Sequence, residues 1–209
     1  LLGAVLEKAT GLALDGLFTQ RIAAPLGLSA GFRRLSAEVP LPQEFAPTGG
    51  SRPREPAPGQ EGLWKVPEHA SQPCQVDDDN AWCLDGVSGH AGLFGTALDV
   101  ARFGLAVLEG RGGSAPWERD LSTPLSTRAL GFDTPSAAGA SCGQRFGRSG
   151  PRGAIGHLGF TGTSLWIDLD RQLVVAFLTN RVALGRANVR IREFRPQVHN
   201  AVLDALKLE

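Results

Sequence analysis

The chain has 209 residues, of which 42% are hydrophobic and 20% are charged. This composition is typical of a globular domain and excludes general disorder. The 21 Lys and Arg residues balance the 21 Asp and Glu residues, so net charge gives no support for bulk binding to nucleic acid or to an acidic membrane surface. No apolar run approaches the roughly 20 residues that a membrane-spanning helix needs. Because the sequence contains no Met, we expect it to begin inside a longer chain.

Two helices are predicted near the start of the chain. The first covers residues 1–10, where apolar side chains recur at helical spacing, and a glycine follows it. No capping residue precedes this helix, so we expect its first residues to lie upstream of the given sequence. The second helix covers Leu14–Ala24, and we expect Pro25 and Gly27 to end it.

A proline-rich segment follows at residues 36–80. It holds eight of the 14 prolines, a density that is incompatible with long helices and central strands. We predict a long ordered loop or a small extension of the same domain. Loops of this length often form the wall or the lid of a site.

A third helix is predicted to begin after Thr96, because Thr96 and Asp99 stand at the spacing of a capping box. We expect Gly110 to end it, a loop over residues 111–127, and a short strand over Ala129–Phe132. The predicted buried stripe of the helix consists of Leu98, Ala101, Leu105 and Leu108.

Three strands are predicted over Ala154–His157, Thr163–Asp168 and Leu173–Thr179. The last two form a hairpin, because only residues 169–172 separate them. The third strand is almost entirely apolar, so we expect it to be central in its sheet and covered on both faces.

A last helix is predicted from about Arg195 to Leu208, with Pro196 in its first turn. Its predicted inward-facing residues are Val198, Val202 and Ala205.

The segment with the clearest chemical content is residues 156–168, in which glycines surround His157 just before the hairpin. Glycine within a strand often permits the close approach of a ligand. His157 is therefore predicted to lie on a strand that borders a cleft. The alternative is a surface histidine in a glycine-rich turn.

The motif His157-Leu158-Gly159 resembles the third motif of the penicillin-recognising serine hydrolases, the class C β-lactamase-like family. That motif reads K-T-G in many members and H-x-G in many esterase-like and peptidase-like ones, and Leu158 stands where Thr is common. Four further segments resemble the family in the same order along the chain. They are LLGAVLEKATG, RIAAPLGL, VSGHAGLFGTALDVARFGLAVL and LVVAFLTN.

The resemblance implies an α+β fold in which an antiparallel sheet is flanked by helices, as in serine β-lactamases, penicillin-binding proteins and DD-peptidases. Residues 1–209 are then the C-terminal portion of a single domain whose N-terminal part is missing. The proline-rich segment 36–80 belongs to that domain as a loop or small extension.

The nucleophile motifs of the family are absent from this sequence. The family acylates the Ser of S-x-x-K, whose Lys helps to remove the proton. None of Lys8, Lys65 and Lys207 has a Ser three residues before it. The sequence has no Tyr and no S-x-N, so the second motif, Y-x-N or S-x-N, is missing too. In the family both motifs precede the helix with which this chain begins, so we expect the chain alone to lack hydrolase activity.

By the same resemblance, His157, Leu158 and Gly159 line the substrate cleft opposite the serine. The backbone N–H of Phe160 is then one oxyanion-hole donor, which stabilises the charge that develops in acyl transfer. His157 could also attract a substrate carboxylate, more strongly when it is protonated. His90 stands in a second H-x-G sequence, and it either lines the site from a loop or has a structural role such as bonding a backbone carbonyl.

The implied function is acyl transfer through a serine ester on small amides or esters: a β-lactam, a D-Ala-ended, peptidoglycan-like peptide or a carboxylic ester. We expect no cofactor, no nucleic acid partner and no membrane span, and the resemblance suggests the cell envelope or secretion. The alternative from another functional class is a non-catalytic binding protein on the same scaffold.

Four residues could form a zinc site, but their spacings lack the usual paired C-x-x-C, so no metal is predicted. They are His69, Cys74, Cys83 and His90. Cys74 and Cys83 could instead form a disulfide if the protein is exported, which leaves Cys142 odd.

Three further groups of polar residues are interpreted as structural. Residues 77–79 (DDD) lack the Gly and Glu of an EF-hand and are predicted to be a solvated acidic turn. Ser88 and Ser164 lack the G-x-S-x-G setting and a sequence-readable base, so no Ser-His-Asp triad is predicted. A solvated basic face, partly paired to carboxylates, is predicted for Arg181, Arg186, Arg190, Arg192 and Arg195.

Overall fold

The computed structural model describes residues 1–37, 45, 46, 48, 75–111, 128–136 and 141–208. They fall into two compact units. The first unit takes in residues 1–95 and 180–188, and the second unit residues 96–179 and 189–209. Most of the proline-rich segment and residues 112–127 of the predicted loop lie outside the described residues. Within the described part, no helix has the length and apolar character to cross a membrane.

The first unit begins with the two predicted helices. Helix α1 (Leu2–Thr10) ends at Gly11, whose φ of 70° is left-handed, as predicted. The second helix is divided into α2 (Leu14–Phe18), the π-helical turn η1 (Thr19–Ala23) and α3 (Ala24–Leu26).

The prediction that Pro25 ends this second helix is wrong, because the helix continues to Leu26, and the prediction for Gly27 is confirmed, because Gly27 is the left-handed C-cap. The N–H of Ala24 bonds the carbonyl of Thr19, five residues back. After this π turn, Pro25 stands at the start of α3, where its missing N–H is tolerated.

The rest of the first unit is held by short elements and polar side chains. Strands β1 (Gly31–Phe32) and β2 (Leu93–Phe94) pair antiparallel. Helix α4 (Asp79–Cys83) and the 3-10 turn η2 (Arg181–Leu184) also belong to the described part of this unit.

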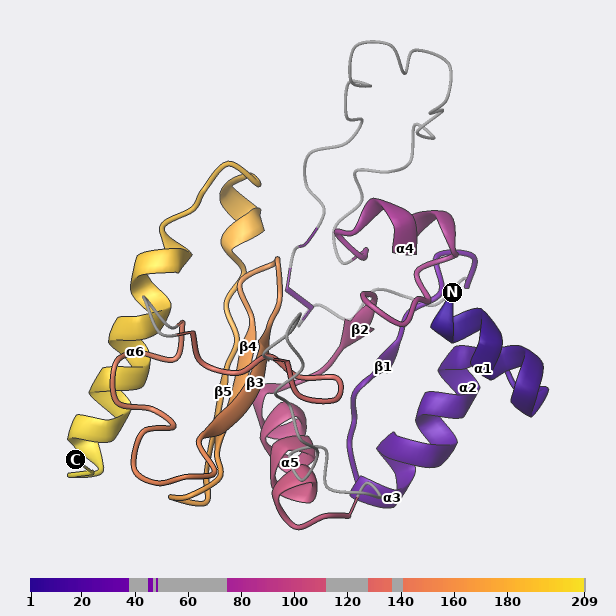
Figure 1. The fold of residues 1–209 in the computed structure, drawn as a ribbon. Coiled ribbons are helices and arrows are strands. Elements are labelled where there is room, and N and C mark those ends of the chain that lie inside the picture. Colours follow the sequence, from indigo (N-terminus) through magenta and orange to yellow (C-terminus); the bar gives the residue numbers. More distant parts are fainter. Residues whose placement is uncertain (38–44, 47, 49–74, 112–127, 137–140, 209) are drawn as a thin grey trace. The chain divides into compact units, whose positions relative to one another are not determined.

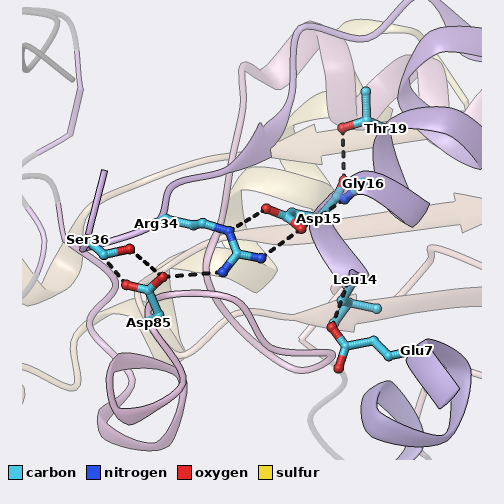
Figure 2. Close-up of polar contacts among 8 residues, drawn as sticks. All are labelled: Glu7, Leu14, Asp15, Gly16, Thr19, Arg34, Ser36 and Asp85. Carbon is cyan, nitrogen blue, oxygen red and sulfur yellow. Dashed lines mark hydrogen bonds and ion pairs between the residues drawn. The ribbon is translucent and has the colours of Figure 1, made fainter. Parts of the chain in front are cut away.

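A network of polar contacts around Arg34 ties α2 to the segment after α4 (Figure 2). The Arg34 guanidinium donates to both oxygens of Asp15, at 2.7 and 3.0 Å, and to Asp85 at 3.3 Å. Asp85 also accepts from the backbone N–H and the hydroxyl of Ser36.

The second unit is built on an antiparallel sheet, β3 (Ala154–Leu158), β4 (Ser164–Asp168) and β5 (Leu173–Phe177), in the order β3-β4-β5. The three predicted strands, the hairpin and the α+β class are confirmed. Among the described strands the central one is β4 and not the predicted third strand, because β4 pairs with both neighbours and β5 with β4 alone. The apolar sequence of β5 indicates that both faces of the strand are covered, and helices on both sides of the sheet provide this cover.

Helix α5 (Ala97–Leu108) packs on one face of this sheet (Figure 1). The predicted capping box is confirmed, because Thr96 and Asp99 exchange side chain–backbone hydrogen bonds. The predicted stripe is wrong, since Leu98 and Leu105 are exposed and Gly104 is buried. A Cβ at Gly104 would lie 2.5 Å from a methyl of Val174 on β5, so the absence of a side chain brings the helix close to the sheet.

Helix α6 (Ile191–Ala205) covers the other face of the sheet (Figure 1). It begins before the predicted start at Arg195, so Pro196 lies inside the helix and not in its first turn. The predicted inward-facing set is also wrong, because Ala205 is exposed and Val198 and Val202 are half-buried. The buried residues recur at every fourth position: Ile191, Arg195, His199 and Leu203.

The predicted strand Ala129–Phe132 is a tight turn, in which the N–H of Phe132 bonds the carbonyl of Ala129 at 3.3 Å. The next residue, Asp133, pairs with Gly156 in both directions, at 2.7 and 2.9 Å. This single bridge lies along the edge of β3, so pairing at this position begins one residue after the predicted strand ends.

Candidate active site

Four of the predicted site residues lie together at the end of β3, in the second unit. His157 and Leu158 are the last residues of the strand, and Gly159 and Phe160 follow them. The side chain of His157 is exposed, and its Nδ1 bonds the carbonyl of Leu158 at 2.9 Å. Because a carbonyl only accepts, Nδ1 carries the proton. In the neutral ring Nε2 is then the nitrogen with a lone pair, which accepts from a ligand, or donates to one once protonated.

The glycines around His157 are required by close contacts. A Cβ at Gly156 would lie 2.4 Å from both the carbonyl oxygen of Leu165 and the ring of Trp166. A Cβ at Gly159 would lie 2.0 Å from the hydroxyl of Thr163. The glycine-rich sequence therefore lets the end of β3 pack tightly against β4 and against the turn that joins them.

Residues 159–163 form that turn, and its polar backbone groups are closely bonded. The N–H of Gly159 donates to the carbonyl of Thr163 at 2.7 Å, and the N–H of Gly162 to the carbonyl of Gly159 at 3.1 Å. Gly162 has a φ of 112°, which favours glycine. The Phe160 side chain is 59% exposed at the tip.

Two side chains from elsewhere in the second unit hold the same turn. Nη2 of Arg195 donates to the carbonyls of Gly159 and Thr163, both at 2.8 Å. The hydroxyl of Thr179 donates to the carbonyl of Gly162 at 2.7 Å. The prediction that Arg195 belongs to a solvated face is wrong, since it is buried in α6. Sequence reasoning missed it because the buried stripe of α6 contains two polar residues.

His90 belongs to the first unit, where it joins two other polar side chains. Its Nδ1 bonds the Ser88 hydroxyl at 2.7 Å, and its Nε2 bonds the Asp78 carboxylate at 2.9 Å. Asp78 also accepts from the N–H of Ala81 as the N-cap of α4. His90 thus bonds two side chains, which fits the structural alternative, while its role stays a prediction; Ser88 has a neighbouring imidazole that the sequence did not reveal.

The contacts of Asp78 determine the direction in which its pKa is shifted. Burial raises the pKa of the Asp78 carboxyl, but the N–H of Ala81 and the His90 ring outweigh it, so the net pKa lies below the ordinary value. An ionised Asp78 caps α4 and orients His90. The arrangement fixes a loop against a helix N-terminus and is open to solvent on the His90 side, which is 55% exposed.

The acidic residues 77–79 do not form a solvated turn, so that prediction is wrong. Asp77 is buried and pairs with Arg186 at 3.1 Å, and Asp79 pairs with the same guanidinium at 3.2 Å. The expected pairing of part of the arginine run to carboxylates is confirmed at Arg186.

No cluster of three or more potential metal ligands occurs within the described residues. His69 and Cys74 lie outside them, so the zinc and disulfide alternatives stay predictions. Cys83 is exposed, and burial raises the pKa of the Cys142 thiol to about 11, which makes that thiol unreactive.

Comparison with known proteins relates this chain to one family. The family model described as Beta-lactamase matches residues 1–198. An N-acetylmuramyl-L-alanine amidase of Bacillus subtilis (strain 168) is 32% identical over 87% of this chain and 42% of its own length. A putative D-alanyl-D-alanine carboxypeptidase of Salmonella agona (strain SL483) is 29% identical over 91% of this chain and 45% of its own length. The chain therefore spans less than half of each of these two relatives.

Two solved structures have a similar fold. A beta-lactamase from Mycobacterium bovis covers 98% of this chain with a TM-score of 0.57 and 16% identity, and 60% of its own chain is matched. EstCE1, a hydrolase with promiscuous acyltransferase activity, covers 93% of this chain with a TM-score of 0.52 and 24% identity, over 54% of its own chain.

Proposed function

Because this chain belongs to the beta-lactamase family, we propose that it supplies the His-x-Gly side of the active site of a serine hydrolase. The observation that supports this most directly is the end of β3, where an exposed His157 precedes a tightly bonded turn. In this proposal Leu158 and Gly159 form the wall of the cleft, and the N–H of Phe160 is an oxyanion donor.

The proposed reaction is acyl transfer through a serine ester. The serine oxygen bonds the substrate carbonyl carbon, its proton passes to a base, and the oxyanion receives hydrogen bonds from backbone N–H groups. The amine or alcohol then leaves with a proton, and water hydrolyses the ester. Since residues 1–209 contain no S-x-x-K, the serine and its lysine come, in this proposal, from a part of the protein outside them.

We propose small amides or esters as substrates. The names of the two relatives refer to N-acetylmuramyl-L-alanine and D-alanyl-D-alanine bonds, which favours a peptidoglycan-like peptide over a β-lactam or a carboxylic ester. The His157 ring suits such a peptide, because a protonated Nε2 donates to its carboxylate.

The proposal is tested with the protein encoded by the complete reading frame and with residues 1–209 alone. The substrates are a chromogenic cephalosporin, a nitrophenyl ester and a D-Ala-D-Ala peptide. We expect the complete protein to turn over at least one of them and residues 1–209 alone to turn over none. Turnover by the 209-residue chain would contradict the proposal.

The role of His157 is tested separately with His157→Gln in the complete protein. The loss of a charge-assisted hydrogen bond raises KM for a carboxylate-bearing peptide by roughly tenfold. A neutral nitrophenyl ester is the matched control, and its KM should not change. An equal change for both substrates would argue against carboxylate binding.

The second candidate is a non-catalytic binding protein on the same scaffold, in which the complete protein would also lack S-x-x-K. Saturable binding of a D-Ala-D-Ala peptide without turnover by the complete protein would select this candidate over the hydrolase.

A further inference from the structure

Arg195 is the one charged side chain among the buried residues of α6 within the described part of the chain, with 6% of its surface exposed. The burial of a guanidinium costs several kcal/mol unless its N–H groups find good acceptors. Here one nitrogen, Nη2, donates to two backbone carbonyls, those of Gly159 and Thr163, both at 2.8 Å. The buried charge is thus directed at the turn that follows the His-x-Gly motif.

One of these carbonyls shares a peptide unit with the N–H of Phe160. In a planar trans peptide the C=O of one residue and the N–H of the next point in opposite directions. A hydrogen bond that holds the Gly159 oxygen toward Arg195 therefore directs the Phe160 N–H away from Arg195. A cationic donor on the carbonyl also polarises the amide, which makes its N–H a stronger donor.

We propose that Arg195 is a positioning residue that sets both the direction and the donor strength of the Phe160 N–H, the oxyanion donor of the acyl transfer proposed above. The inference rests on that proposed function and adds a residue on α6 that touches no substrate. Arg195 should therefore change the acylation rate constant more than substrate binding, because an oxyanion forms only as the acyl group is transferred.

The turn offers a matched comparison within the same loop. The hydroxyl of Thr179 bonds the carbonyl of Gly162. This carbonyl belongs to a different peptide unit, whose N–H is not the proposed oxyanion donor. Loss of this bond loosens the turn at Gly162 but leaves both hydrogen bonds of Arg195 to the turn in place. Arg192 offers a second comparison, because it is an exposed arginine on the same helix.

The experiment uses the complete protein and the variants R195Q, R195K, R192Q and T179V. The acylation rate constant and the substrate Kd are measured separately, together with the melting temperature. R195Q should lower the acylation rate constant by roughly 10² to 10³-fold, the range for loss of one oxyanion donor, with Kd changed less than about threefold. R195K keeps the charge and should retain more activity than R195Q.

The comparison variants define what a merely structural role would give. T179V should lower the melting temperature with less than about a threefold loss in acylation, and R192Q should change neither. If R195Q does not fold, R195K carries the kinetic test, with a loss in acylation and an unchanged Kd expected. Equal acylation losses in R195K and T179V, or wild-type acylation in either Arg195 variant, would overturn the inference.

A failure of the proposed function is distinguishable from a failure of the inference. If the wild-type protein acylates no substrate, the proposed function is wrong. The claim that Arg195 controls the Phe160 N–H is then tested by the NMR signal of the Phe160 amide. Its ¹⁵N resonance should shift in R195K and stay in place in R192Q and T179V. An unshifted resonance in R195K would show that Arg195 does not control this peptide.

Discussion

Two arginine-centred networks of this molecule differ in what surrounds them. Arg195 is buried and donates to backbone carbonyls of one turn. Arg34 is 39% exposed and donates to the carboxylates of Asp15 and Asp85 (Figure 2). Water competes with the second network and has little access to the first. We conclude that the second unit depends on a few buried polar groups, whereas single exposed pairs of the first unit contribute little.

The largest effect is expected at Asp168, a fully buried carboxylate of the second unit. It accepts from the N–H of Gly147 at 2.8 Å and from the backbone and side chain of Arg171 at 2.9 and 2.8 Å. Asp168→Ala removes the partner of a nearly buried guanidinium and should destabilise the fold by about 3–5 kcal/mol. Urea denaturation measures this, and Asp204→Ala, an exposed acid on α6, should cost less than about 1 kcal/mol. Equal losses of stability in the two variants would contradict the difference between buried and exposed carboxylates.

His199 predicts a pH dependence for the second unit. Burial, reinforced by the nearby charge of Arg195, lowers the pKa of His199 to about 4 from an ordinary 6.5. The unfolded chain then binds a proton that the native state does not, so stability is full above pH 6.5 and falls as the pH drops toward 4. The expected loss is about 3 kcal/mol.

The matched variants for this pH dependence are His199→Leu and His157→Gln. His199→Leu should remove the loss of stability between pH 6.5 and 4, whereas His157→Gln, at an exposed site, should retain it. Chemical denaturation at a series of pH values provides the measurement. A pH dependence that survives in His199→Leu would refute the assignment to this residue.

Glycine substitutions sharpen the contrast between the units. Gly156→Ala places a methyl 2.4 Å from a backbone oxygen and an indole ring and should cost about 1–3 kcal/mol. Gly16→Ala in α2 meets nothing within 4 Å and should stabilise that helix by about 0.5–1 kcal/mol. Melting temperatures report both changes, and a stabilising Gly156→Ala would show that the close packing of β3 on β4 is overestimated.

The smallest effect is expected for the exposed network. The hydrogen bond from Arg34 lowers the pKa of Asp15 below its ordinary value of 3.8. A lowered carboxyl pKa gives stability that is present above this value and is lost as the pH falls below it. Because both side chains are partly exposed, Arg34→Gln should cost less than about 1 kcal/mol at pH 7 and less in high salt. A loss above 2 kcal/mol, on the scale of buried pairs, would contradict this.

The parts of the fold that were predicted from sequence depend on neighbouring residues. The capping box of Thr96 and Asp99 is formed within one helical turn, and the β4–β5 hairpin follows from a four-residue connection. Which strand is central depends on pairing partners that the sequence of one strand does not contain, so the central place of β4 among the described strands was not predicted.

The failures in the helices have a different cause. Periodicity assumes that the largest apolar residues are buried, but α5 buries Gly104 because the sheet approaches closely there. In α6 the same assumption chose Val198, Val202 and Ala205 as the inward-facing residues, and Arg195 was placed on a solvated face, whereas Arg195 and His199 are buried. The burial of Arg195 depends on acceptors far away in the sequence, the carbonyls of Gly159 and Thr163, and His199 packs against the ring of Phe146.

The roles of the candidate site residues stay predictions. The glycines around His157 were interpreted as room for the close approach of a ligand, whereas Gly156 and Gly159 are closely approached by residues of β4 and of the β3–β4 turn. The bond between His90 and Asp78 was not predictable, because these residues are 12 positions apart and are joined through the N-cap of α4.

The most direct test of the central claim is covalent labelling of the complete protein. It is treated with a fluorescent penicillin and a fluorophosphonate, and the modified residue is identified by peptide mass spectrometry. We predict one labelled serine, in an S-x-x-K motif outside residues 1–209. Label on Ser88, next to His90, or on any other serine within these residues would contradict the claim, as would the absence of any label.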